Sequence, residues 1–203
     1  MSTIHQFNDV ADIGAAIASD DQFLVKDTSL GQTTRSDASR LNTLVAGAAT
    51  AAEIARNTDV STRMIAAGST LTLTEASHEG KIIALDTAAG STVTLPDATG
   101  GGGVYRFLIT VTATSNSHII KVANATDEMR GSIMAATDAA GAPINTFTAA
   151  DNDDTITFNR TTTGTAAQGH WVECVDATNN HWFVRGFIEQ SGTEATPFSN
   201  TVS

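Results

Sequence analysis

The stretch 171–188, WVECVDATNNHWFVRGFI, decides the fold class of this chain. Its two ends, Trp171 to Val175 and Trp182 to Ile188, are rich in the β-branched and aromatic residues that favour strands. Between them, Asp176 to Asn180 closes with an Asn-Asn pair that is typical of a turn. The stretch therefore predicts a β-hairpin. We expect both of its tryptophan side chains to be core anchors rather than a ligand platform.

The two-residue period of the hairpin extends upstream to about Ser69. Apolar residues alternate with threonine around Leu71, Val93 and Ile156, as in half-buried strands whose threonines face solvent. More continuous apolar runs, predicted as strands buried on both faces, occupy 81–85, 104–111 and 118–122. Turn residues separate these segments at regular intervals. We therefore expect a mainly β domain over 68–203, an antiparallel β-sandwich of jelly-roll type with about ten strands.

Residues 1–67 follow a helical period instead. A short helix is predicted after Asn8, and a second one, with a thin Ala-rich apolar face, after Ser36 or Asp37. Between the two helices the chain carries the compact apolar run 23–25 and a turn at 27–32. We therefore expect a small N-terminal arm of short helices and an extended segment. Such an arm needs to pack on the β domain, on a symmetry mate or on a partner.

The charge of the chain argues against two classes of partner. Its formal net charge is −11, from 22 acidic and 11 basic residues, and no stretch gathers more than an isolated basic residue or two. Nucleic-acid phosphates and anionic membrane surfaces attract clustered Lys and Arg, so we expect neither as a partner. Charged residues amount to only 16%. We expect Thr, Ser, Asn and Gly to cover the remaining surface, or other subunits to bury part of it.

The sequence also indicates a cellular compartment. Cys174 is the only cysteine, so the chain has no intrachain disulfide. Its start is polar and lacks the basic and apolar regions of a signal peptide. The apolar runs are far shorter than the ~20 residues of a membrane helix. We therefore expect a protein that is made and kept in a cytoplasm.

Three features resemble ligand sites, but none matches its motif. The glycine run 100–103 leads into another predicted strand, whereas a phosphate loop leads into a helix. The acidic turn 151–154 lacks the glycine and glutamate of a calcium loop. His170 and His181 hold matching places in the hairpin, yet a metal site needs more ligands. Because no nucleophile signature such as GxSxG occurs either, we expect no enzyme, no cofactor and no metal.

A set of segments between Thr70 and Phe198 forms a distinctive pattern of strands and turns. They are STVTLP (91–96), GGGGVYRF (100–107), SNSHIIKVA (115–123), DEMRG (127–131) and GTEATPFS (192–199). This pattern resembles bacteriophage and prophage virion proteins of the capsid decoration, or cement, type. The segment 20–29 is similar to modules near the start of phage fibre and decoration proteins.

The resemblance implies a small protein on the capsid exterior, made in the host cytoplasm. Proteins of this type bind the major capsid protein and are usually homotrimers over local threefold axes. We expect the N-terminal arm to contact the capsid or to clasp neighbouring subunits, because it carries apolar groups outside the β core. The candidate contact residues are Phe7, Ile13, Ile17, Phe23, Leu24 and Val25.

Three alternatives stay open. A short head or tail fibre with a receptor- or glycan-binding tip would expose an aromatic patch on its trimer. A polysaccharide-degrading enzyme would need a pair of carboxylates in a cleft. A carbohydrate-binding module would need exposed, coplanar Trp or Tyr side chains.

Overall fold

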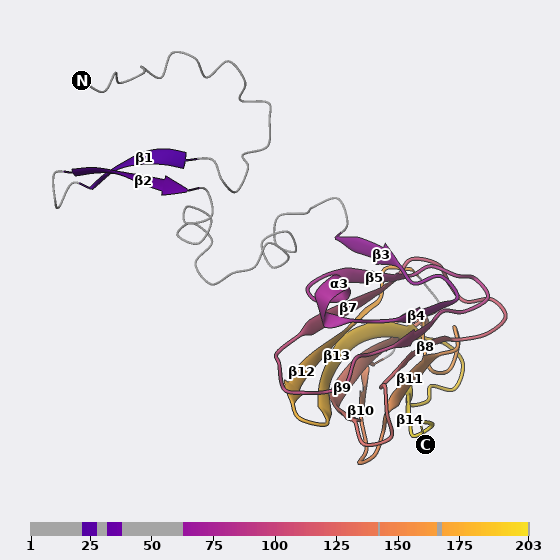
Figure 1. The fold of residues 1–203 in the computed structure, drawn as a ribbon. Helices are drawn as coiled ribbons and strands as arrows, with labels where there is room; N and C mark the ends of the chain where they lie inside the picture. The colour runs from indigo at the N-terminus through magenta and orange to yellow at the C-terminus, as the bar shows by residue number, and fades with distance from the viewer. Residues whose placement is uncertain (1–21, 28–31, 38–62, 142, 166–167, 203) are drawn as a thin grey trace, which may run out of the picture. The chain divides into compact units, whose positions relative to one another are not determined.

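Strands make up almost every element of the protein in the computed structural model, which describes residues 22–27, 32–37, 63–141, 143–165 and 168–202. The chain divides into two units, Met1–Thr58 and Asp59–Ser203. In the first unit the described residues form one antiparallel hairpin, β1 (Gln22–Asp27) and β2 (Gln32–Asp37). All other described elements belong to the second unit (Figure 1).

Two sheets build the second unit, which is a mainly β sandwich. Its elements are β3 (Met64–Ala66), β4 (Thr70–Thr72), α3 (Glu75–His78), β5 (Ile82–Leu85), β6 (Thr92–Thr94), β7 (Val104–Ile109), β8 (His118–Lys121), β9 (Glu128–Thr137), β10 (Asn145–Thr148), β11 (Thr155–Phe158), β12 (Trp171–Thr178), β13 (His181–Gln190) and β14 (Phe198–Ser199). The larger sheet has seven strands in the order β10-β9-β13-β12-β7-β5-β3. The smaller sheet has five strands in the order β14-β11-β8-β6-β4.

Both sheets are mixed, whereas the sequence predicted antiparallel pairing throughout. From β3 to β8 the chain alternates between the two sheets, placing odd-numbered strands in the larger and even-numbered strands in the smaller. Each crossing reverses the chain, so two crossings restore its direction. As a result β3, β5 and β7 pair in parallel, and so do β4, β6 and β8. A strand in the opposite sheet thus serves as the crossover that parallel pairs require.

The core fills the space between the sheets. Ile83, Phe107 and Trp182 enter it from the larger sheet, and Val93 enters it from the smaller one. The rings of Tyr105 and Trp182 meet edge to face, with centroids 5.5 Å apart and an interplanar angle of 72°. Because side chains alternate along a strand, the other residues of β7, β12 and β13 lie on the outer face of the larger sheet.

The mainly β fold and the sandwich are confirmed, with several corrections of detail. The described strands of the second unit include β9, a ten-residue strand that the two-residue period of the sequence did not predict. Residues 104–109 and 118–121 alternate between buried and partly exposed positions, so β7 and β8 are not buried on both faces as expected. Thr155 was expected to face solvent, but it is buried.

The N-terminal predictions are tested only in part. Ser36 and Asp37, expected to cap a helix, are the last two residues of β2. The helix predicted after Asn8 lies outside the described residues. Met64 to Ala66, which the sequence assigned to the N-terminal arm, form an edge strand of the larger sheet through parallel pairing with β5.

Candidate functional site

The outer face of the seven-stranded sheet bears large apolar side chains that are open to solvent. Trp171 on β12 lies in register between Leu108 on β7 and Phe187 on β13, and Met134 on β9 pairs with Phe187. We call these four residues the tryptophan row. The side chain of Trp171 is 41% exposed and that of Met134 is 50% exposed. Contiguous exposed apolar groups of this size mark interaction surfaces in soluble proteins.

Trp171 was expected to be a core anchor, and this prediction is wrong. Of the two tryptophans in the hairpin only Trp182 is buried, at 1% exposure. The pairing of β12 with β13 places the two on opposite faces of the sheet: Trp182 pairs with the buried Asp176, whereas Trp171 pairs with Phe187 of the outer face. The outer face therefore carries an aromatic ring that is not part of the core.

A row of charged residues crosses the outer face next to the tryptophan row. Glu173 on β12 lies between Arg106 on β7 and Arg185 on β13. The Nε of Arg106 donates to Oε2 of Glu173 at 2.7 Å, and the Nε of Arg185 donates to Oε1 at 2.7 Å. We call these three residues the Arg–Glu–Arg triad. Its two guanidinium charges and one carboxylate charge leave a local charge of +1.

The two arginines cover the carboxylate of the triad. The side chain of Glu173 is 5% exposed, whereas those of Arg106 and Arg185 are 60% and 72% exposed. The hydrogen bond from Arg106 lowers the pKa of Glu173; burial opposes this effect, and Arg185 adds to the lowering. Glu173 is therefore ionised at neutral pH, and the positive charge of the triad faces solvent.

A second apolar row lies on the other side of the triad. Val175 on β12 is in register between Val104 on β7 and Phe183 on β13. We call these three residues the phenylalanine row, in which Phe183 is 49% exposed. On β7, β12 and β13 the outer face thus has two apolar rows with a charged row between them, and on β9 the charged Arg130 lies in register with Phe183.

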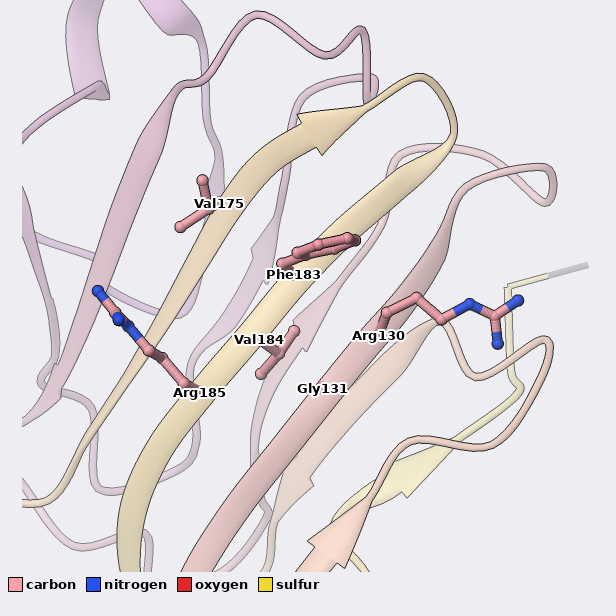
Figure 2. Close-up of a pocket in the computed structure, with 6 residues that line it drawn as sticks. All are labelled: Arg130, Gly131, Val175, Phe183, Val184 and Arg185. Atoms are coloured by element: carbon pink, nitrogen blue, oxygen red, sulfur yellow. The ribbon is translucent and has the colours of Figure 1, made fainter.

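A pocket of about 430 Å³ opens beside the phenylalanine row. Figure 2 shows Phe183 above the sheet, with the side chains of Arg130 and Arg185 extending to opposite sides. Arg130 forms ion pairs with Glu128 and Asp151. The pocket lining consists of Arg130, Gly131, Val175, Phe183, Val184 and Arg185.

The backbone conformation at position 131, in the lining of this pocket, requires a glycine. Its φ is +125°, a conformation that residues with a side chain rarely adopt. A Cβ atom at this position would lie 2.0 Å from the carbonyl oxygen of Val184. The glycine therefore permits the close approach of β9 and β13, and it leaves space above the sheet.

The glycine run 100–103, examined as a phosphate loop, binds a carboxylate of the protein itself. Gly100 N–H donates to Oδ1 of Asp176 at 2.7 Å, and Gly101 N–H donates to Oδ2 at 3.0 Å. The Thr99 hydroxyl adds a hydrogen bond at 2.9 Å. Burial raises the pKa of Asp176, but these hydrogen bonds outweigh it and hold the pKa below its ordinary value. The N–H groups that would bind a phosphate are thus occupied.

The described residues contain no cluster that resembles a metal centre. No group of three or more His, Cys, Asp or Glu in this part of the chain is placed to hold a metal ion. His170 and His181, which hold matching places in the hairpin sequence, stand at opposite ends of the hairpin, because Trp171 pairs with Phe187 and His181 pairs with Thr178. Over the same residues, no helix has the length and apolarity to cross a membrane.

Two other candidates from the sequence have structural roles. Cys174 is fully buried, and burial raises the pKa of its thiol far above the ordinary value. In the acidic turn, the carboxylate of Asp154 accepts hydrogen bonds from the N–H groups of Thr201 and Val202 at 2.8 and 3.0 Å. Asp154 thus fixes the C-terminal segment instead of forming a cation site.

The predicted contact residues fall into two groups. Phe23, Leu24 and Val25 lie in β1, where they pair with Ser36, Arg35 and Thr34 of β2. Phe7, Ile13 and Ile17 lie outside the described residues. Comparisons of the chain with known protein families, curated proteins and solved structures found no match.

The outer face was not predicted from the sequence, although the sequence contains a signal for it. In 182–188, WFVRGFI, both alternating sets of residues include large apolar side chains. A strand with one solvated face normally has polar residues in one of the two sets. A strand that is apolar on both faces therefore indicates that the face outside the core is also covered.

Proposed function

We propose that this protein is a structural, non-enzymatic component of a phage particle, a decoration or cement protein on the outside of the capsid. In this proposal it binds the major capsid protein as a homotrimer. The observation that supports it best is the outer face, where exposed apolar rows flank an ion-pair network on a rigid sheet. The pattern between Thr70 and Phe198, which resembles phage decoration proteins, supports the identity of the partner.

The size of the outer face suits a stable protein interface. Seven strands spaced about 4.8 Å apart give a width of about 29 Å, and strands of the length of β12 and β13 extend about 26–33 Å. Because β3, β5 and β10 have only three or four residues, the area is at most about 800 Å², close to the surface that each partner contributes to a standard protein–protein interface.

The expected mechanism is mass action. A protein that binds the assembled capsid lattice, and not its dissociated subunits, stabilises the lattice by RT ln(1 + [L]/Kd) for each site. Three linked copies increase this effect, because the second and third contacts form at a high effective concentration. A rigid sheet face serves this purpose well, since its binding loses little conformational entropy.

The experiment measures native mass and capsid binding of the full chain. Light scattering should give a species near three times 21.0 kDa. The protein should also sediment with empty, expanded shells of the phage whose genome encodes it, and should raise the temperature at which they dissociate. A chain that neither binds these shells nor changes their stability would rule out the proposal.

One observation favours a second candidate, a short fibre with a glycan-binding tip. Trp171 and Phe183 are exposed aromatic side chains on one sheet face, and sugars stack on such rings. A glycan array with the full chain tests this alternative. Saturable binding to a defined glycan, abolished by Trp171→Ser, together with no binding to shells would favour the fibre.

A further inference from the structure

We infer that the partner segment covering the outer face presents a carboxylate to Arg106 and Arg185, with large apolar side chains on both sides of it. This inference rests on the proposed function only in treating the outer face as an interface. It adds the chemistry of the partner, which is an acidic and apolar segment of another protein.

The charge of the Arg–Glu–Arg triad determines what can cover it. Two guanidinium groups share the single carboxylate of Glu173, so one positive charge is uncompensated within the triad. In the free protein, water solvates this charge, because the side chains of Arg106 and Arg185 are largely exposed. A wholly apolar partner would remove the water and leave a buried, unpaired charge, which is strongly unfavourable. An incoming carboxylate removes this penalty.

The same charge disfavours a second copy that stacks its outer face with the triads in contact. In a twofold arrangement whose axis passes near the triad, triad would lie against triad. Among the described carboxylates of this face, Glu173 and Glu128 are already paired with arginines, and Glu189 lies farther along β13, four residues or about 13 Å from Arg185. A dimer with its triads in contact would bring like charges together, with Glu189 of each copy away from the contact, and like-charge contacts oppose association.

The register of the strands sets the spacing of the partner's side chains. On β12, Trp171 belongs to the tryptophan row, Glu173 to the triad and Val175 to the phenylalanine row. Each step of two residues along a strand covers about 6.6 Å. A partner strand aligned with β12 therefore matches the face when it carries an apolar residue, an acidic residue and a second apolar residue at alternate positions.

The pocket beside the triad favours a protein segment over an acidic sugar. Its lining between the two arginines consists of Gly131, Val175, Phe183 and Val184. None of these side chains has a hydrogen-bond donor or acceptor. Apart from the backbone carbonyl oxygen of Val184 beside Gly131, this lining offers few partners for sugar hydroxyls, whereas Leu or Phe side chains need none.

The probe is a synthetic peptide, acetyl-Thr-Leu-Thr-Glu-Thr-Leu-Thr-amide, titrated into the ¹⁵N-labelled full chain and followed by NMR. We expect saturable shifts at the backbone amides of 171–175 and 183–187 and at the Nε–H groups of Arg106 and Arg185. The matched peptide with Gln in place of Glu should bind about threefold more weakly or worse, the effect of losing one exposed ion pair.

The variant Glu173→Gln separates this inference from a purely structural role. It leaves both arginines uncompensated and preserves the side-chain shape, so it should bind the Glu peptide about threefold more tightly or better than the unaltered chain does. If Glu173 only stabilised the fold, the substitution would weaken binding or leave it unchanged. The control Lys121→Gln removes a positive charge from the five-stranded sheet and should leave binding to the peptide unchanged.

Four results would overturn the inference. The first is no shifts on the outer face up to about 10 mM peptide, which corresponds to a binding free energy weaker than about −3 kcal/mol. The second is equal affinity for the Glu and Gln peptides. The third is preferential binding of N-acetylneuraminic acid at the same amides, and the fourth is self-association that shifts those amides. Shell binding without discrimination between the two peptides would disprove the inference alone. Peptide binding without shell binding would disprove the proposed capsid function alone.

Discussion

Trp171 and Trp182 are the same residue type in one hairpin, yet they have opposite surroundings. Trp182 is buried against Tyr105, whereas Trp171 is exposed on the outer face. A buried aromatic ring contributes several kcal/mol to folding, and an exposed one contributes little. Substitutions at the two residues therefore separate effects on folding stability from effects on binding.

We predict opposite effects for Trp171→Ser and Trp182→Ala. Trp182→Ala should lower the free energy of unfolding by about 3–5 kcal/mol, because it leaves a cavity in the core. Trp171→Ser should change it by less than about 1 kcal/mol but should weaken shell binding at least about tenfold, as expected for an aromatic residue at the centre of an interface. Urea unfolding and co-sedimentation measure the two quantities. A large loss of stability in Trp171→Ser would contradict an exposed position.

His118 connects stability to pH. Its Nδ1 accepts a hydrogen bond from the N–H of Ser91 at 3.1 Å, and its Nε2 lies 2.7 Å from the carbonyl oxygen of Val111. This arrangement requires a neutral ring with the proton on Nε2. Burial lowers the pKa of His118 below its ordinary value, and the contact with Val111 opposes this only in part.

We predict that this histidine destabilises the fold in mild acid. The unfolded chain binds a proton near pH 6.5, whereas the folded protein binds it only at lower pH. The contribution of His118 is therefore fully present above pH 6.5 and is lost as pH falls towards the pKa of the folded state. Urea midpoints between pH 8 and 5 should fall more steeply for the unaltered chain than for His118→Gln. Parallel curves would contradict the prediction.

At the scale of elements, the loop between β6 and β7 depends on the end of β12. The carboxylate of Asp176 accepts hydrogen bonds from Thr99, Gly100 and Gly101 and thereby holds the glycine run in place. These residues are more than 70 positions from Asp176 in the sequence. A loop rich in glycine has high conformational entropy when unfolded, so such anchoring is needed to order it.

We predict that Asp176→Asn lowers the free energy of unfolding by about 1–3 kcal/mol, because an amide cannot accept hydrogen bonds at both of its terminal atoms. Hydrogen exchange at the amides of Gly100 and Gly101 should accelerate by more than the global loss of stability explains. The exposed Asp138→Asn serves as the control and should change neither quantity. Equal exchange rates in the unaltered chain and Asp176→Asn would contradict the anchoring role.

At the scale of the whole molecule, the two units allow their roles to be tested separately. The second unit contains both sheets and the outer face, while the described part of the first unit is the hairpin of β1 and β2. The sequence predicts that the first unit contacts the capsid or neighbouring subunits. The contact residues proposed there include Phe23, Leu24 and Val25.

We predict that a chain lacking Met1–Thr58 keeps the cooperative unfolding of the second unit but loses trimer formation or binds shells at least about tenfold more weakly, because multivalent attachment is lost. Circular dichroism melting, light scattering and co-sedimentation measure these three properties. The triple substitution of Phe23, Leu24 and Val25 by Ser in the full chain is a second test. Unchanged mass and shell binding in both variants would exclude the first unit as a contact region.

Part of the outer face could be inferred from the amino acids, but its orientation could not. In β13 the two alternating sets contain Trp182, Val184 and Ile188 on one side and Phe183 and Phe187 on the other. Both sets are apolar, so periodicity alone does not decide which of them is buried. The register of β12 against β13 and the packing of the second sheet decide it.

The sequence by itself determined that the protein is mainly β, where most strands of the second unit lie, and that the hairpin of β12 and β13 forms, because these properties depend on local alternation and turn residues. Only the tertiary structure decided the parallel pairing, since β3 to β8 alternate between sheets and the direction of each strand depends on the crossing before it. The tertiary structure also brought together Arg106, Glu173 and Arg185, which come from three strands. Such long-range neighbours leave no period in the sequence, because their proximity arises from the pairing of whole strands.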